Sequence, residues 1–162
     1  MPIKVLTDEY IGETLKIDTA TDKVEVNIDN DTIKKDVNGI LFVESPAVTV
    51  SMVAGEPLSG GMLVYINSSG TISKFNQSDV NLCDKALGFT NSSAVADERI
   101  NVVKSGKCIE MGGLTPGAVY FADNNGSVTT IPPSIGIRQV VGTAESATIL
   151  LVDIKDAFIK IE

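Results

Sequence analysis

The sequence has no histidine and no tryptophan, and its only cysteines are Cys83 and Cys108. Histidine is the commonest general base and a frequent metal ligand, so its absence removes much of the usual catalytic and metal-binding repertoire. Neither cysteine has a histidine to activate it, and the two are too far apart for a Cys-x-x-Cys site. Because both lie beside apolar residues, we predict buried, unreactive thiols. We expect no catalytic residue, no cofactor and no metal site.

Basic clusters and long apolar stretches are missing as well. The formal net charge is -8, and without grouped lysine and arginine side chains we do not expect binding to nucleic-acid phosphates. No apolar run reaches the ~18 residues that a membrane span needs, and the N-terminal residues lack the apolar core of a signal peptide. What remains is a chain of 162 residues, 43% of them hydrophobic, which is long enough for one domain with a buried core.

The composition changes near residue 50. Residues 1–50 carry ten acidic side chains and five lysines, whereas residues 51–162 are rich in glycine, serine, threonine and valine. We place a boundary between Phe42 and Glu56, around Ser45-Pro46. The chain is thereby divided into an N-terminal arm, residues 1–50, and a C-terminal β domain, residues 51–162.

The arm contains two segments, residues 14–17 and 23–28, in which apolar and polar side chains alternate. Such alternation predicts strands with one buried face, joined here by a turn at residues 20–22, and residues 33–41 fit a short helix or a further strand. Two or three strands bury too little to be stable alone. Their apolar face must pack against other copies of the chain about a symmetry axis, or extend the edge of the main sheet. In the first case the interface between chains consists of Leu15, Ile17, Val24, Val26 and Ile28.

The C-terminal part predicts an all-β fold, because short runs rich in β-branched residues alternate with turn-forming residues. Asn125-Gly126 is typical of a hairpin turn with positive φ at both central residues. Pro116-Gly117 fits a type II turn, in which glycine supplies the positive φ. Pro132-Pro133 is expected to end a strand, since neither residue can donate a ladder hydrogen bond. The predicted strands include residues 63–66, 86–89, 100–103, 119–121, 140–141 and 149–152.

An internal repeat connects these features, because residues 58–73 align with residues 114–129. Three positions are identical at a constant spacing of 56: Leu58/Leu114, Gly61/Gly117 and Gly70/Gly126. Chance similarity between two glycine-rich hairpins is the alternative. If the repeat is real, neither half can bury its apolar face alone, and the two halves pack together as a small barrel or sandwich.

Residues 113–121, GLTPGAVYF, are followed by NGSVTTIPPS at 125–134 and VVGTAESATILLV at 140–152. Together they resemble a β module of tailed-phage virion proteins, which occurs in head fibres, capsid decoration proteins and some tail fibres. Residues 55–65 resemble part of the first half of that module, and the likeness covers residues 52–154. The resemblance implies a homotrimer fixed to the particle surface, often anchored by its N-terminal part. It implies no catalytic residues.

We therefore expect a structural protein of a bacteriophage virion, a head fibre or capsid decoration protein. It would be made in the bacterial cytoplasm and would assemble as a homotrimer on the capsid surface. Its expected partners are its own copies and the major capsid protein or other virion proteins, not nucleic acid or a membrane. A receptor- or glycan-binding module of a fibre is the alternative, with Asn91–Ser93 and Asp123–Asn125 as candidate loops. A small glycan depolymerase is a third hypothesis, and it requires a pair of carboxylates in a cleft.

Overall fold

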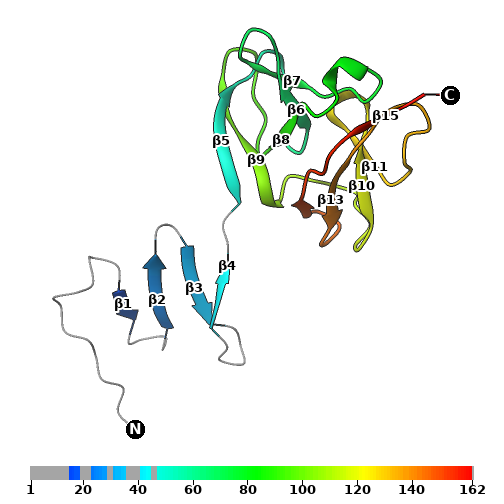
Figure 1. Ribbon diagram of the computed structural model, residues 1–162. Helices are drawn as coiled ribbons and strands as arrows, with labels where there is room; N and C mark the ends of the chain where they lie inside the picture. The colour runs from blue at the N-terminus through cyan, green and yellow to red at the C-terminus, as the bar shows by residue number, and fades with distance from the viewer. Residues whose placement is uncertain (1–14, 19–22, 29–30, 36–40, 45–46, 162) are drawn as a thin grey trace. The chain divides into compact units, whose positions relative to one another are not determined.

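The computed structural model describes residues 15–18, 23–28, 31–35, 41–44 and 47–161 (Figure 1). The chain forms two compact units, Met1–Pro46 and Ala47–Glu162. The composition predicted a division into residues 1–50 and 51–162, so the observed boundary lies slightly earlier in the chain. Strand β5 (Val48–Val53) pairs along its length with β9 (Arg99–Cys108), so that residues 48–50 belong to the second unit.

The described strands of the first unit form one antiparallel sheet in chain order. Both alternating segments contain strands, as their pattern predicts. Residues 33–41 fit a helix or a strand by sequence, and their described members are in strands. The turn predicted at residues 20–22 lies outside the described residues. The strands are β1 (Leu15–Asp18), β2 (Lys23–Ile28), β3 (Asp31–Lys35) and β4 (Leu41–Glu44).

The second unit is built around a nine-stranded antiparallel sheet that curls into a half-barrel (Figure 1). The prediction of an all-β fold made of two repeated halves is confirmed. The first repeat contributes β6 (Leu63–Ile66), β7 (Ile72–Lys74), the short 3-10 helix η1 (Val80–Leu82), β8 (Ala86–Thr90) and the start of β9. The second repeat contributes β10 (Val119–Ala122), η2 (Asn124–Gly126), β11 (Val128–Thr129), β13 (Val140–Ala144) and β14 (Leu150–Val152).

The two repeats have the same hydrogen-bonding pattern. In each, a central strand, β6 or β10, pairs with two antiparallel neighbours. The register with the following long strand, β8 or β13, shifts after the second residue of the central strand, at Val64/Tyr65 and at Tyr120/Phe121. A β-bulge is a local irregularity, so its recurrence at equivalent positions shows that the sequence repeat is also a structural repeat.

The predicted turns have the expected backbone conformations. Gly117 has a φ of 78°, and the amide of Ala118 donates a hydrogen bond of 3.1 Å to the carbonyl of Thr115, which completes the turn. Asn125 and Gly126 have φ values of 55° and 72°, so both central residues of the predicted hairpin turn have positive φ. These turns fix where the strands of the second repeat begin.

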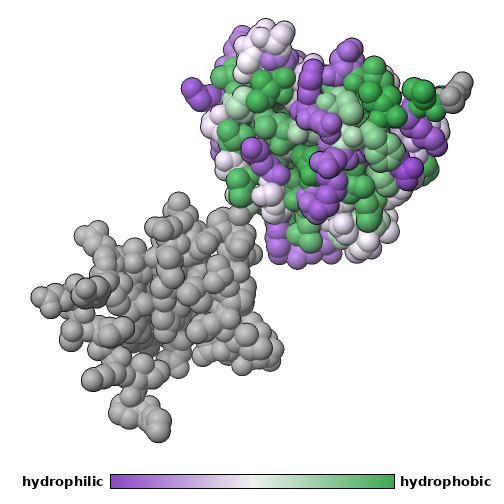
Figure 2. Space-filling view, viewed as in Figure 1, coloured by the Kyte–Doolittle hydropathy of each residue, from purple (hydrophilic) through white to green (hydrophobic). Residues whose placement is uncertain are grey.

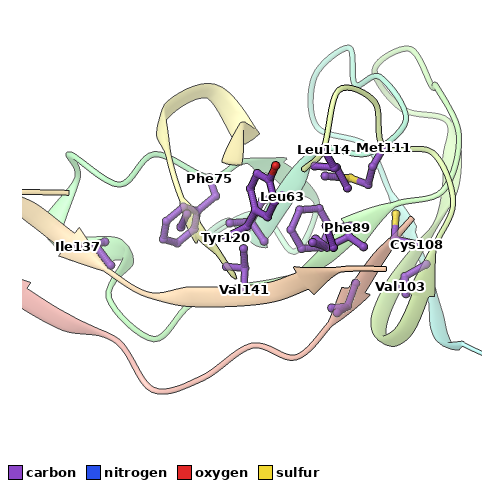
Figure 3. Packing of buried hydrophobic residues seen from close by; sticks show 14 of the residues in the cluster. Leu63, Phe75, Phe89, Val103, Cys108, Met111, Leu114, Tyr120, Ile137 and Val141 are labelled. Carbon is purple, nitrogen blue, oxygen red and sulfur yellow. The ribbon is translucent and has the colours of Figure 1, made fainter. Parts of the chain in front are cut away.

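The main core joins the two repeats (Figure 3). Leu63, Phe75 and Phe89 of the first repeat are fully buried, and Tyr120 and Val141 of the second repeat belong to the same cluster. The first repeat therefore buries one face against the second, as expected for halves that are too small to fold alone. A smaller cluster lies where β5 adjoins the first repeat; its buried members are Ala54, Leu58, Val64, Ile72, Ala94, Ile100 and Val102.

The last strand, β15 (Phe158–Lys160), pairs with β12 (Gly136–Arg138) in a separate two-stranded sheet. Asp84 Oδ1 accepts a hydrogen bond of 2.8 Å from the amide of Ala157, just before this strand. Two residues before Ala157, the carbonyl of Lys155 accepts a hydrogen bond of 2.9 Å from Nε2 of Gln139. Side chains from two loops thus fasten the C-terminal segment to the second unit.

Gly88 and Gly142 are equivalent positions at which a neighbouring strand passes close to the backbone. A Cβ at Gly88 would lie 2.2 Å from the carbonyl oxygen of Val103, and a Cβ at Gly142 would lie 2.4 Å from that of Leu151. We expect Gly88→Ala to lower the free energy of unfolding by about 1–3 kcal/mol, because β9 must shift to admit the methyl group. Urea unfolding measures this change.

Gly112→Ala is the matched control, because a Cβ at Gly112 meets no atom within 4 Å. Substitutions away from such close contacts usually change stability by about 0.5 kcal/mol or less. If Gly88→Ala unfolded at the same urea concentration as the parent, the close approach of β8 and β9 would be contradicted.

Candidate functional site

The backbone register of the N-terminal sheet places the five predicted interface residues on one face. Leu15 is opposite Val26, and Ile17 is opposite Val24. Directly opposed residues of an antiparallel pair lie on the same side of the sheet, and residues two positions apart in a strand share a side. Ile28 follows Val26 by two positions and completes the set.

The same register adds residues that the sequence did not identify. Val26 is opposite Ile33, Ile33 is opposite Val43, and Leu41 lies two positions from Val43 on the same face. Asp31 and Lys35, the first and last residues of β3, also belong to this face. The other face holds mainly polar residues in the described strands: Lys16, Asp18, Lys23, Glu25, Asn27, Thr32, Lys34, Phe42 and Glu44.

In the second unit, the guanidinium group of Arg138 lies near two aromatic rings. Its central carbon is 5.6 Å from the ring centre of Phe121 and 5.7 Å from that of Phe158, distances at which cation–π attraction operates. Together with Val140 and Asp156, these residues line an open cleft of about 350 Å³. Within the described part of the chain, the guanidinium group of Arg138 makes no hydrogen bond or ion pair, so its N–H groups can bind an acceptor from outside.

Sequence reasoning missed this cleft. Its residues come from β10, from β12 and β13, and from the C-terminal segment around β15, and they follow no short motif. Only the pairing of β12 with β15, which sets Arg138 opposite Phe158, brings the charge and the ring together.

A second open cleft, of about 460 Å³, lies near the turn between β10 and β11. One of its residues, Asp123, belongs to a loop that the sequence suggests for glycan binding. The oxygen Oε1 of Gln77 is buried and has no hydrogen-bond partner in the described structure. The other lining residues are Thr129, Ile131, Pro132, Pro133, Ser134 and Ile135.

The loop Asp123–Asn125 is engaged in contacts between the repeats. Asn124 Oδ1 accepts hydrogen bonds from the amide and the hydroxyl of Ser78, at 3.2 and 2.9 Å. The amide of Asn125 donates to Asn76 Oδ1 over 2.7 Å. Two of the three loop residues therefore dock the second repeat on the first, which leaves Asp123 as the loop's contribution to the cleft.

The other candidate residues suggested by the sequence do not line either cleft. In the loop Asn91–Ser93 both serines are exposed, and neither cleft includes them. No three histidine, cysteine, aspartate or glutamate side chains within the described ranges are grouped so that they could hold a metal ion.

The two cysteines differ in burial. Cys108 is fully buried, and the pKa of its thiol is raised chiefly because burial disfavours the charged thiolate. The charge of Glu110 adds to this rise, while a backbone hydrogen bond at Glu110 opposes it. The prediction of a buried thiol is confirmed for Cys108. It is wrong for Cys83, which is only partly buried at the end of η1.

No model of a known protein family matches this sequence, and a search among curated proteins found no match. Among the helices that the structure describes, none is long and apolar enough to cross a membrane.

We expect a thiol reagent such as iodoacetamide to label about one cysteine per folded chain at pH 8, and that cysteine is Cys83. A thiol with a raised pKa stays protonated to higher pH, and the thiolate is the reactive species, so burial and protonation both protect Cys108. Mass spectrometry of labelled peptides measures the result. Denaturant should expose both thiols, and Cys83→Ser should remove nearly all labelling of the folded chain. Rapid labelling of Cys108 without denaturant would contradict the described core.

Proposed function

We propose that this protein is a structural component of a bacteriophage virion, a head fibre or capsid decoration protein that assembles as a homotrimer on the capsid surface. The first unit associates with other copies and with the major capsid protein or another virion protein, and the second unit projects from the shell. The observation that carries the proposal is the one-sided sheet of the first unit. Its register aligns the five predicted interface residues on one face.

A sheet with one apolar face needs a second layer to cover that face. The described strands of Met1–Pro46 all belong to one sheet. Copies of the chain can provide the missing layer, because identical faces can be buried against one another about a symmetry axis. Each aliphatic side chain that becomes buried contributes roughly 1.5–3 kcal/mol. Five of them per chain are comparable with the roughly 4–15 kcal/mol that association costs.

The second unit supports the same proposal. Its repeats form a curled sheet whose turns have glycine and asparagine in left-handed conformations, which fixes the strand connections. This is the part of the chain in which residues 52–154 resemble virion β modules. Net negative charge, -8 for the chain, also helps to keep many copies soluble before they assemble.

We expect Val26→Asp to lower the oligomeric mass of the full chain, because a carboxylate on the apolar face must be desolvated when copies associate. Static light scattering measures the mass. Asn27→Asp is the matched control: it places the same carboxylate on the next residue of β2, on the other face of the sheet. If both variants kept the parent's mass, association through the N-terminal sheet would be contradicted.

A second candidate function is glycan binding at a fibre tip, and the cleft that contains Asp123 favours it. Carboxylate, hydroxyl and amide groups from Asp123, Thr129, Ser134 and Gln77 line this cleft, and such groups can bind sugar hydroxyls. Strong and selective signals on a glycan array that Ser134→Trp abolishes by filling the cleft would support this function. An array without selective binding would remove it.

A further inference from the structure

We propose that a second copy of this chain covers the outer face of the second repeat, defined here as Val119, Phe121, Thr143 and Leu151. These residues lie on β10, β13 and β14. The inference rests on the proposed structural function and adds to it a contact surface in the second unit.

In the first repeat, the equivalent face of the sheet is covered and its residues are buried. Leu63 of β6 is opposite Phe89 of β8, which is opposite Val103 of β9. All three belong to the main core, with exposed fractions of 0%, 0% and 3%. Tyr65, two positions after Leu63, packs against the same core. The layer that covers them is the second repeat.

The equivalent row of the second repeat has no such cover. Val119 of β10 is opposite Thr143 of β13, which is opposite Leu151 of β14, and this row corresponds to Leu63, Phe89 and Val103. Val119 is 44% exposed and Leu151 is 38% exposed. Phe121 corresponds to Tyr65 and is half-buried.

The contrast is largest just beyond β7 and β11. Phe75 of the first repeat is fully buried, whereas Ile131, at the equivalent position of the second repeat, is 76% exposed. Single exposed apolar side chains are common on protein surfaces. The outer face differs because Val119 and Leu151 lie in one row across three strands, on either side of Thr143. In the same molecule, a related sheet with larger apolar side chains at these positions is covered. In Figure 2 hydrophobic residues reach the surface among hydrophilic ones on the side where Figure 1 places β10 and β13.

The chain cannot cover this face with its own first repeat. The face of that repeat that does not meet the second repeat holds Val64 and Ile72, and it is already packed against Val50 and Met52 of β5. The covering layer that we propose is therefore a part of another molecule, not the first repeat.

The charges next to the outer face indicate that this molecule is a second copy. Phe121 connects the face to the cleft of Arg138 and Asp156. No ion pair joins Arg138 to Asp156 within the described residues, so both charges lack an internal partner in the same cleft. A second copy brings one positive and one negative group of its own, so that each charge meets an opposite one. Arginine and aromatic side chains are also enriched where interfaces are strongest.

The test uses Val119→Asp in the full chain, with Leu151→Asp as a second variant. We expect each to raise the dissociation constant between copies about tenfold or more, as measured by sedimentation velocity over a range of concentrations. Arg138→Glu should weaken association in the same experiment. Ile66→Asp is the matched control, because Ile66 is a β-branched strand residue of nearly equal exposure, 45%, whose equivalent, Ala122, is not on the outer face. Circular dichroism confirms that each variant is folded.

The outcomes separate this inference from the proposed function. If the folded Val119→Asp and Leu151→Asp variants kept the parent's dissociation constant while Val26→Asp dissociated, the outer face would be excluded and association through the N-terminal sheet would stand. The reverse pattern would support the outer face and contradict the N-terminal interface. A parent chain that stayed monomeric, or that bound a glycan through the outer face as a monomer, would overturn the inference.

Discussion

The packing of the second repeat against the first is the interaction on which the rest of the described structure depends. The large apolar residues of each repeat lie on one face of its sheet, and that face needs the other repeat to cover it. Phe75 and Phe89 of the first repeat become buried only because the second repeat supplies Tyr120 and Val141. The asparagine-rich turn of the second repeat reinforces this packing through its hydrogen bonds to Asn76 and Ser78. Because of this mutual dependence, we expect the two repeats to unfold together.

The two repeats differ in how many of their faces are covered. One repeat buries both faces, against its partner and against β5, while the other keeps one face outward. The N-terminal sheet, described by itself, has an apolar row and a polar row on its two faces. Two β surfaces of the chain thus carry apolar residues without a covering layer among the described residues of their own unit, and we propose both as contact surfaces between molecules. The proposed function in assembly rests on these two surfaces.

Local sequence signals accounted for much of this fold. Alternation identified β1 and β2, positive-φ residues marked the turns at Gly117 and Gly126, and the spacing of 56 positions revealed the repeat. Strands β5, β12 and β15 escaped prediction for a physical reason. Each is defined by pairing with a strand far along the chain, and β12 and β15 are only three residues long. Short strands of this kind are set by tertiary contacts more than by their own residues.

The candidate sites also differ in how far each could be predicted from the sequence. The alternating pattern of residues 14–17 and 23–28 was sufficient to select five residues that the register then placed on one face, but Ile33 and Val43 required the pairing of β3 and β4. The cleft around Arg138 was not predictable, because Phe121 comes from the first strand of the second repeat and Phe158 from the C-terminal segment that follows this repeat. A pattern within one segment is visible in a sequence, whereas a site made by several strands depends on the fold.

The central claim is that this chain functions by associating with its own copies. Native mass spectrometry of the full, unmodified chain at micromolar concentration tests it most directly, because it counts the chains in each particle. We predict particles of three chains that persist on dilution. A spectrum containing single chains alone at every concentration would contradict it.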